Sequence, residues 1–394
     1  MDASVSTNDR NFLFAHRVLM RSALSLVATF AWIFVFQYYL SYSLSLPLAL
    51  FATVVVYGLS QALLVFLTPF SAAHLRGGVK RSMMFGASFA ALALAILGAT
   101  IVGFFSDPAG WGIVLFGILF GAYRALYWIP YRIRTAPFSG RSHIFFDFLI
   151  ALMPLFAGIT IASENGGFLR LLSGAAACIA LSIVPLLPMT DVREKFSWSF
   201  DETFQIFFNP RHRLLMWRTL LAGFENAALF LIWPLAVFLI VGASFPTMGL
   251  VLSASLVIVL LFRGLYRRIL KRIFERESIL LTVVFVSSGW LFRFVAGSPF
   301  AIVFADTYSF VHSPFGAREL ILHESSLDGG SYLDEFTALQ EIGQGLGRIL
   351  MCAFVVLLLP VLGVQITLAL SILAAGIAAG GSVVLAYKIR KLAY

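Results

Sequence analysis

The sequence predicts an all-α membrane protein with twelve transmembrane helices in two pseudo-symmetric six-helix bundles. Three observations lead to this prediction. Hydrophobic residues make up 60% of the chain and charged residues only 12%, whereas soluble domains contain about 25% charged residues. Long apolar runs recur along the chain, each near the roughly 20 residues that cross a bilayer. Finally, residues 212–219 (HRLLMWRT) repeat residues 16–22 (HRVLMRS) with one extra residue, an offset of 196 (212 − 16) in a chain of 394.

Twelve apolar runs account for nearly the whole sequence. They lie at about residues 18–40, 45–70, 81–105, 110–131, 142–162, 167–188, 214–241, 246–266, 277–297, 299–321, 336–360 and 363–387. Continuous runs of this length are typical of helices, because a transmembrane β-barrel shows shorter, alternating segments. Almost nothing remains for a soluble domain.

The connections between these runs alternate in charge. Every second connection is basic and holds Arg10 and Arg17; Arg76, Lys80 and Arg81; Arg132, Arg134 and Arg141; Arg193, Lys195, Arg211 and Arg213; Arg267, Arg268, Lys271, Arg272 and Arg276; or Lys388, Arg390 and Lys391. Near the other connections, Arg170 is the only basic residue that we identify. The positive-inside rule therefore predicts cytoplasmic termini and an even number of crossings. The net charge of +9 follows this pattern and does not indicate a nucleic-acid partner. Compact loops favour a bacterial inner membrane.

A polar stretch divides the chain near its middle. We expect an N-terminal bundle at 1–190, a cytoplasmic linker at 191–213 and a C-terminal bundle at 214–394. Ser199 and Glu202 have the spacing of a capping box. The helix that follows would place Phe200, Phe204, Phe207 and Phe208 on one face and lie on the membrane surface. Asn209-Pro210 would end this helix; the alternative is an irregular loop with scattered aromatic residues.

Signatures of enzymes and cofactors are lacking in the sequence. It contains no nucleotide-binding loop, no dinucleotide fingerprint and no paired metal-ligand histidines. Cys178 and Cys352 both lie inside apolar runs, so we expect neither a disulfide framework nor a metal site. We predict no cofactor and no catalytic activity, and we expect no cleaved signal peptide.

The architecture resembles the major facilitator superfamily of secondary transporters, and one loop carries part of its motif. That family's loop between helices 2 and 3 reads Gly-x-x-x-Asp-Arg-x-Gly-Arg-Arg, and residues 71–80 here read SAAHLRGGVK. Arg76, Gly78 and Lys80 fit the pattern, while Ser71 replaces the glycine and Leu75 the aspartate. The resemblance implies a gating loop at Arg76, Gly78 and Lys80, without the role that belongs to the acid. The helix 5 signature of drug antiporters is also missing.

Ionisable residues inside the runs are candidate functional groups, because each is costly in a bilayer unless it is paired or hydrated. Arg124 lies 8 residues before Arg132 (132 − 124), and Asp147 lies 6 residues after Arg141 (147 − 141). These spacings give depths of about 12 and 9 Å. The similar depths predict an Arg124–Asp147 pair, which would be either functional or a structural lock.

Glu225 is the main candidate for a proton site. It lies 12 residues after Arg213 (225 − 213), which is about 18 Å into the membrane. Asn226 is beside it and Trp233 lies two turns further on. The alternative is a hydrogen bond that only holds helices together.

The second half contains further charges within its runs. We expect Arg293 to reach Asp306 across the short turn at 297–299, and Arg348 to meet Glu225 or an anionic substrate. Glu341 shares a helical face with Arg348, so a closed charge network within this half is the alternative.

Aromatic and glycine patterns add two expectations. Tyr127, Trp128 and Tyr131 share a face with Arg124 and would line a cavity with Trp32, Gln37 and Trp233, unless they are simply core residues. G-x-x-x-G spacings at Gly117/Gly121 and Gly376/Gly380 predict close helix packing.

Together these features predict a monomeric secondary transporter that moves a small solute by alternating access, with possible coupling to protons. Its binding site would use Glu225, Asn226, Asp306, Arg348, Arg124, Asp147, Tyr127 and Trp233. Two alternatives are a transporter-like sensor or assembly factor that does not transport, and an intramembrane enzyme.

Overall fold

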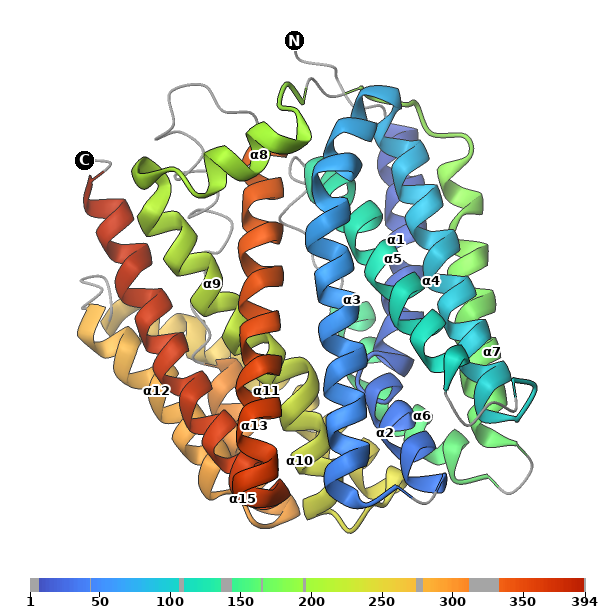
Figure 1. Cartoon of the computed structure of the whole chain (residues 1–394), viewed down its shortest axis with the longest axis vertical. Coiled ribbons are helices and arrows are strands. Elements are labelled where there is room, and N and C mark those ends of the chain that lie inside the picture. The colour runs from blue at the N-terminus through green and yellow to red at the C-terminus, as the bar shows by residue number, and fades with distance from the viewer. Residues whose placement is uncertain are drawn as a thin grey trace.

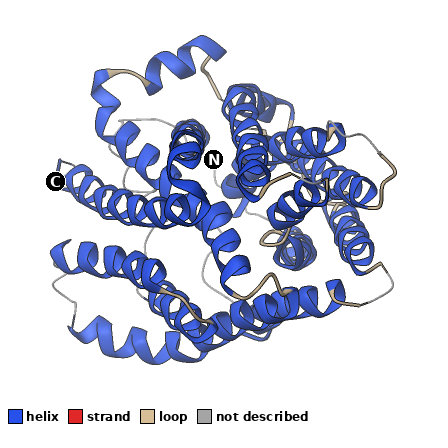
Figure 2. Ribbon diagram, turned by 60° about the horizontal axis from the view of Figure 1, so that its bottom comes forward, coloured by secondary structure: helices blue, strands red, loops and turns tan. Residues whose placement is uncertain are grey.

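The computed structural model describes residues 7–42, 44–105, 110–135, 144–163, 166–193, 196–273, 279–311 and 333–392. Residues 312–321 of the tenth predicted run lie outside this part, as do Arg141, Lys195 and Arg276 of the basic connections. Within it, regular structure is entirely helical (Figure 2). This confirms the predicted all-α class.

Seven helices form the first group, which lies to the right in Figure 1. They are α1 (Thr7–Val27), α2 (Ala31–Ser41), α3 (Leu46–His74), α4 (Val79–Ile101), α5 (Trp111–Thr135), α6 (Ile144–Ile161) and α7 (Gly167–Ser182). The short helix α8 (Phe200–Phe207) leads to a second group on the left. That group comprises α9 (Arg213–Ala227), α10 (Trp233–Ile240), α11 (Phe245–Ile273), α12 (Ile279–Val295), α13 (Pro299–Val311) and α15 (Leu333–Leu392).

Each of the twelve predicted apolar runs is mainly helical where it is described, with turns inside or at the ends of several. The first run corresponds to α1 and α2 together, and the seventh to α9 and α10, which a π-helical turn at Ala228–Ile232 joins. The last two runs share α15, which bends at Gly363, where φ is 71°. In the described part of the chain, eight segments are long and apolar enough to cross a membrane, and the segment Glu335–Ile389 contains that bend. The shorter apolar helices Phe145–Ile161 and Ile279–Val295 match runs five and nine.

The outer surface of the helices is apolar. Phe66, Leu357 and Ile377 are 53%, 72% and 79% exposed. Polar side chains such as Gln61 and Arg348 are instead buried between helices. This distribution is the reverse of what water would favour and fits lipid as the solvent.

Glycines allow the helices to approach closely, as their spacing predicted. A Cβ atom built on Gly117 would lie 2.8 Å from Cγ1 of Val56 in α3, and one on Gly121 would overlap the Ser60 carbonyl oxygen. In the second group, a Cβ atom on Gly376 would lie 2.9 Å from the Trp290 Cβ. Without side chains at these positions, α5 packs directly on α3, and α15 on α12.

Among the described residues, the two groups meet most extensively along two helix pairs, α3 with α15 and α6 with α11. Gly345 of α15 faces Val65 of α3 so closely that an added Cβ would clash with it. At the other pair, Gly158 and Gly249 lie against the backbone carbonyl oxygens of Phe245 and Pro154. Polar residues on the facing sides of these helices therefore lie at the boundary between the groups.

The connecting segment contains the predicted capped helix. The Ser199 hydroxyl accepts a hydrogen bond from the Glu202 amide, and the Glu202 carboxylate accepts one from the Ser199 amide. Phe200 packs on Phe70 of α3 with ring centroids 5.0 Å apart. Phe207 is buried, but Phe208 at the C-cap is 59% exposed. The prediction of one four-phenylalanine face is therefore wrong for Phe208, because the helix ends before that residue.

Candidate functional site

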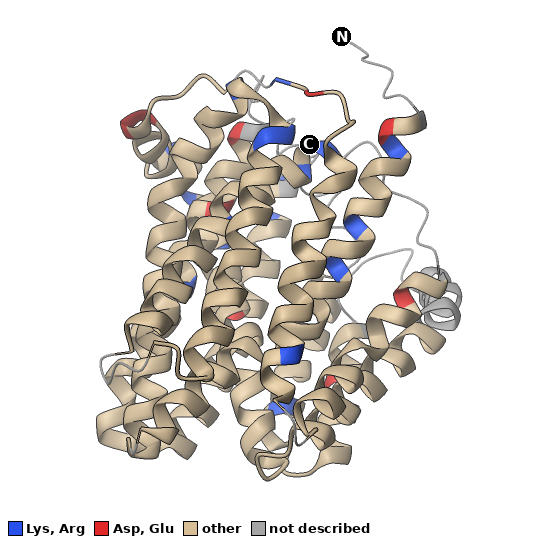
Figure 3. Ribbon diagram, turned by 90° about the vertical axis from the view of Figure 1, so that its right-hand side faces the viewer, with Lys and Arg blue, Asp and Glu red and all other residues tan. Residues whose placement is uncertain are grey.

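Two clusters of polar side chains stand out in the interior of the described structure. The first, which we call the cross-interface cluster, comprises Gln61 of α3, Arg132 of α5, and Gln340, Glu341, Gln344 and Arg348 of α15. The second, the single-side cluster, comprises Glu225, Trp233, Trp290, Arg293 and Asp306 of α9, α10, α12 and α13. Figure 3 shows that most Lys and Arg residues lie toward the end where α1 begins and α15 ends, with few charges in the interior.

Arg348 links the two helix groups. It is 2% exposed and lies 13 residues after Glu335 and 15 before the bend at Gly363 (348 − 335 and 363 − 348). Its Nη1 donates a hydrogen bond to Oε1 of Gln61 at 3.2 Å, and its Nη2 donates one to Oε1 of Gln344 at 3.1 Å. The first bond joins α15 to α3 near the middle of both helices.

A second polar link joins the groups nearer the end where α15 begins. Nη2 of Arg132 lies 3.0 Å from Oε1 of Glu341. Nη1 of the same arginine donates a hydrogen bond to Oε1 of Gln340 at 3.2 Å. This ion pair therefore ties α5 to α15.

Several atoms around this cluster have no hydrogen-bond partner among the described residues. They are Nε of Arg348, Nε of Arg124, Oε2 of Glu341 and the Tyr57 hydroxyl oxygen. Arg124 also lies close enough to Arg348 and Tyr57 to interact with them electrostatically. Buried polar atoms are normally satisfied, so this is the least satisfied part of the described interior.

The single-side cluster is fully connected within the second group. Arg293 and Asp306 form the predicted ion pair, with Nε to Oδ1 at 3.0 Å. Nε1 of Trp233 donates to both carboxylate oxygens of Asp306, at 3.0 and 3.2 Å. The Arg293 guanidinium also lies 4.7 Å from the ring centroid of Trp290. The result matches the closed network that was the alternative reading of these charges.

Glu225 belongs to this second cluster. Its Oε1 accepts a hydrogen bond from Nε1 of Trp290 at 3.1 Å. The described contacts of Arg348 are with glutamines, so the expected meeting of Arg348 with Glu225 is not found. Glu225 and the adjacent Asn226 are both half-buried.

The expected Arg124–Asp147 pair does not occur among the described ion pairs. Asp147 of α6 lies near Arg21 of α1 instead, and α6 packs against α1. Arg124 lies by α3 and α15. Similar depth therefore did not place the two side chains on facing surfaces.

Tyr127 is held inside the first group. Nδ1 of His16 lies 2.7 Å from the carbonyl oxygen of Ser182, and Nε2 lies 2.8 Å from the Tyr127 hydroxyl. A carbonyl oxygen can only accept, so Nδ1 carries the proton and the Tyr127 hydroxyl donates to Nε2. Tyr127 also stacks on Tyr131 with ring centroids 5.3 Å apart. These contacts support the core alternative for this aromatic face.

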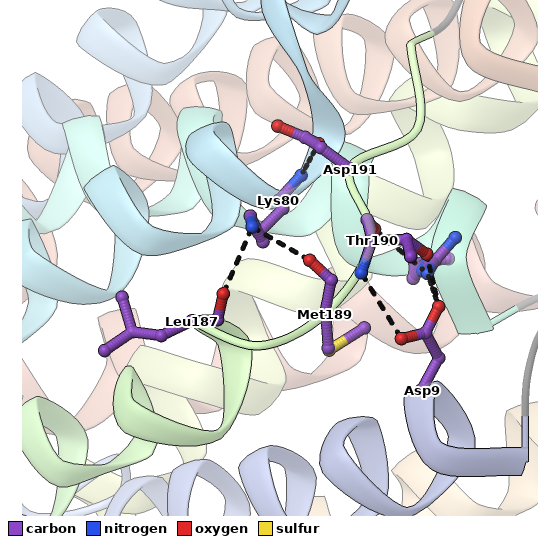
Figure 4. A network of polar contacts seen from close by, with 7 residues as sticks. Asp9, Lys80, Leu187, Met189, Thr190 and Asp191 are labelled. Carbon is purple, nitrogen blue, oxygen red and sulfur yellow. Dashed lines mark hydrogen bonds and ion pairs between the residues drawn. The ribbon is translucent and has the colours of Figure 1, made fainter.

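The loop residues Arg76, Gly78 and Lys80 contact the start of the connecting segment. The Lys80 amide donates to Oδ1 of Asp191 at 2.9 Å, and its Nζ donates to the Met189 carbonyl oxygen at 2.8 Å (Figure 4). Nε of Arg76 donates to the Phe196 carbonyl oxygen at 2.6 Å. Gly78 has φ 136°, and a side chain there would overlap the Asp191 carboxylate. Asp191 thus provides a carboxylate at the start of α4.

A further network fixes the same segment to α1 and α5. Asp9 accepts hydrogen bonds from the Thr190 hydroxyl and from Nη2 of Arg134, the latter at 3.1 Å (Figure 4). The predicted gating loop is therefore bonded to its own helix group and to the connecting segment. In the described contacts it does not bridge to the second group.

Aromatic residues join the groups at the opposite end of the molecule from α8. The ring of Phe245 in α11 has its centroid 5.7 Å from that of Phe34 and 5.5 Å from that of Phe168. Phe238 of α10 lies 5.0 Å away on the other side. The groups thus meet through polar contacts between α5 and the first part of α15, and through rings at the far end.

The sequence indicated Arg348 and Glu341 but not their partners. Gln61 is a lone amide in an apolar run, and Gln340, Gln344 and Arg348 recur every fourth residue, so they share a helical face. That spacing was a signal for a polar stripe on α15. Arg132 was interpreted only as part of a basic connection.

No protein-family model and no curated sequence matches the chain. Solved structures do resemble it. A D-xylose-proton symporter superposes with a TM-score of 0.65 at 14% identity, covering 97% of each chain. The nucleoside transporter NupG, as a single-residue variant, gives 0.60 at 15% identity, covering 97% of this chain and all of that one. A POT family transporter gives 0.59 at 12% identity, covering 97% and 95%. At such low identities these similarities establish the fold.

Proposed function

We propose that this protein is a secondary transporter that moves a small solute across a membrane by alternating access. The observation that carries the proposal is the cross-interface cluster. Arg348 and Gln61 connect α15 to α3 near mid-depth, in a chain whose surface is suited to lipid. In a duplicated helical transporter the solute site lies between the repeats near the bilayer midplane. The fold shared with solved transporters supports the same function.

The moving units would be the segments 1–190 and 214–394, with 191–213 as the linker. Opening at one end requires breaking the Arg132–Glu341 pair, and opening at the other requires separating Phe245 from Phe34 and Phe168. The polar contacts can be exchanged for contacts with water or solute, and the aromatic contacts bury only apolar area. Rocking about the cluster would alternate between the two openings.

We further propose that Glu225 is the proton-coupling residue. It is a partly exposed carboxylate near the centre of the seventh run and is joined to the Arg293–Asp306 pair through Trp290. Protonation would remove its charge and weaken its acceptance of the Trp290 hydrogen bond. The second helix group would then respond to the proton gradient.

The proposed setting is a bacterial inner membrane, with the basic end and both termini in the cytoplasm. The distribution of Lys and Arg toward that end supports this orientation. We expect a monomer, with lipid and a small solute as its partners and no nucleic acid.

The test begins with purified protein and a thermal-shift screen of metabolites. Each stabilising compound is then measured for counterflow and for proton-driven uptake in proteoliposomes. We expect Glu225→Gln to abolish proton-driven uptake and to retain counterflow, because exchange does not require net proton movement. The control is Asp201→Asn, an exposed carboxylate in α8.

Unchanged proton-driven uptake in Glu225→Gln would remove Glu225 from the mechanism. If none of the stabilising compounds showed counterflow, a transporter-like sensor or assembly factor would be favoured instead.

A further inference from the structure

Two arginines share a buried region that contains too little negative charge to balance them. Arg348 and Arg124 interact electrostatically, and both have an Nε atom without a partner among the described residues. Their neighbour Arg132 is already paired with Glu341. Among the residues that the structure describes here, three guanidinium groups and one carboxylate leave a surplus of two positive charges. Unbalanced buried charge is strongly unfavourable, so this region is suited to a further anion.

The donor groups are positioned for such an anion. The Arg348 side chain is fixed by Gln61 and Gln344, which occupy its Nη1 and Nη2 atoms. Its Nε remains unused, as do Nε of Arg124 and the hydroxyl of Tyr57, which is 1% exposed. Trp32 packs edge-on against Tyr57 with ring centroids 4.9 Å apart and so holds the phenol in place. Guanidinium and phenol donors together suit carboxylate or phosphate oxygens.

The position also separates this region from lipid headgroups. Arg124 is 13 residues from the start of α5 and 11 from its end (124 − 111 and 135 − 124), which is about 16–20 Å from either end of the helix. Glu341 lies 7 residues before Arg348, about 10 Å closer to the start of α15. Glu341 interacts electrostatically with Arg132, Arg348 and Arg124, and its single negative charge is shared among the three arginines.

We propose that the solute is a small organic anion whose carboxylate or phosphate group binds between Arg124, Arg348 and Tyr57. This inference rests on the proposed transport function and names the substrate class. The structure supplies two cations at mid-depth from opposite helix groups, α5 and α15. An anion that bridges them would hold the groups together in the occluded state.

Binding is measured on purified protein in detergent, so the test does not require transport. The probes are acetate, succinate, citrate, inorganic phosphate and glycerol 3-phosphate at matched ionic strength, with glycerol, glucose and succinamide as neutral counterparts. We expect one or more of the anions to raise the unfolding temperature, and the neutral compounds to have no such effect. The carboxylate and phosphate arms distinguish the two anion chemistries.

Variants then locate the site. Arg348→Gln and Arg124→Gln should each lower the affinity for the most strongly stabilising anion by about tenfold or more, as expected for loss of a charge-assisted hydrogen bond. Arg348→Lys should lower this affinity less, because the positive charge is kept. Arg170→Gln is the matched control, since it removes an exposed arginine of α7. Elution as a single detergent-solubilised species shows that a variant is folded.

A second readout does not depend on the choice of probe. Without ligand, Arg124→Gln should raise the unfolding temperature by about 2 °C or more, because it removes like-charge repulsion. Three results would each overturn the proposal. They are stabilisation by none of the anions, equal anion binding by wild type and the two glutamine variants, and a ligand-free stability of Arg124→Gln below that of wild type. Anion binding without counterflow would leave it standing and contradict transport alone.

Discussion

The two buried clusters contain similar residues but differ in how completely they are satisfied. In the single-side cluster, Asp306 accepts from Arg293 and Trp233, and the remaining face of Arg293 lies on Trp290. None of its five residues has an unpartnered buried side-chain atom in the described part of the chain. The cross-interface cluster and its neighbours have four such atoms. A complete network suits a fixed structure, and an incomplete one suits a site that exchanges partners.

The largest effect on stability should come from breaking the complete hydrogen-bond network of the single-side cluster. Asp306→Asn leaves Arg293 as a buried, unpaired cation and should destabilise the protein by about 3–5 kcal/mol. Thermal unfolding in detergent measures this loss, with Asp201→Asn as the exposed control. The double variant Arg293→Gln/Asp306→Asn should recover part of the stability, because it removes both charges.

A different result would change the comparison between the clusters. If Asp306→Asn unfolded at the wild-type temperature but lost uptake, the single-side cluster would be part of the transport site. Asp306, Trp233 and Arg293 would then be solute or proton ligands and not a structural network.

Breaking the Arg132–Glu341 ion pair between the groups should lower stability less than Asp306→Asn does and should lower transport activity more. The Arg132 side chain is 32% exposed, so water can partly replace its partner. We expect Arg132→Gln to lower stability by about 1 kcal/mol, because Arg348 and Arg124 still lie near the Glu341 carboxylate, and to reduce counterflow, because one closed state loses its ionic contact. The exchange Arg132→Glu/Glu341→Arg should restore activity toward wild type.

Uptake by Arg132→Gln equal to that of wild type would show that this pair does not hold a closed state. A stability loss as large as that of Asp306→Asn would mean that the pair is structural, and the distinction between the clusters would fail.

The fold could be predicted from the sequence because its determinants are local. Run length, the alternation of basic connections and the Ser199–Glu202 spacing each depend on neighbouring residues. The Arg293–Asp306 pair was predictable for the same reason, since 13 residues and one short turn separate its members. The glycine pairs likewise reported packing through a simple spacing.

Contacts between distant helices were not predictable in this way. Arg348 and Gln61 are 287 residues apart, and Lys80 and Asp191 are 111 apart. Their meeting depends on how each helix is rotated about its axis, which a single sequence leaves open. Depth alone led to the wrong Arg124–Asp147 pair. The solute site remains a hypothesis because its essential feature, the surplus of cations, arises only when α3, α5 and α15 come together.

The smallest effect should come from the connecting segment, which provides an exposed reference for both buried clusters. Hydrogen bonds from the Ser199 amide and hydroxyl lower the pKa of the exposed Glu202 carboxylate. Because the folded pKa is the lower one, the charged carboxylate stabilises the capped helix at pH values above the unfolded pKa of 4.5. This contribution is lost as the pH falls through the folded pKa. Hydrogen exchange of the α8 amides, corrected for the intrinsic rate at each pH, should therefore quicken at acid pH. Glu202→Gln should exchange independently of this titration after correction for the intrinsic rate, with the amides of α15 as the internal control. Equal corrected rates for wild type and Glu202→Gln on both sides of the titration would mean that the cap does not order this segment. The linker would then be held by its other contacts, among them those of Lys80 with Asp191 and of Arg76 with Phe196.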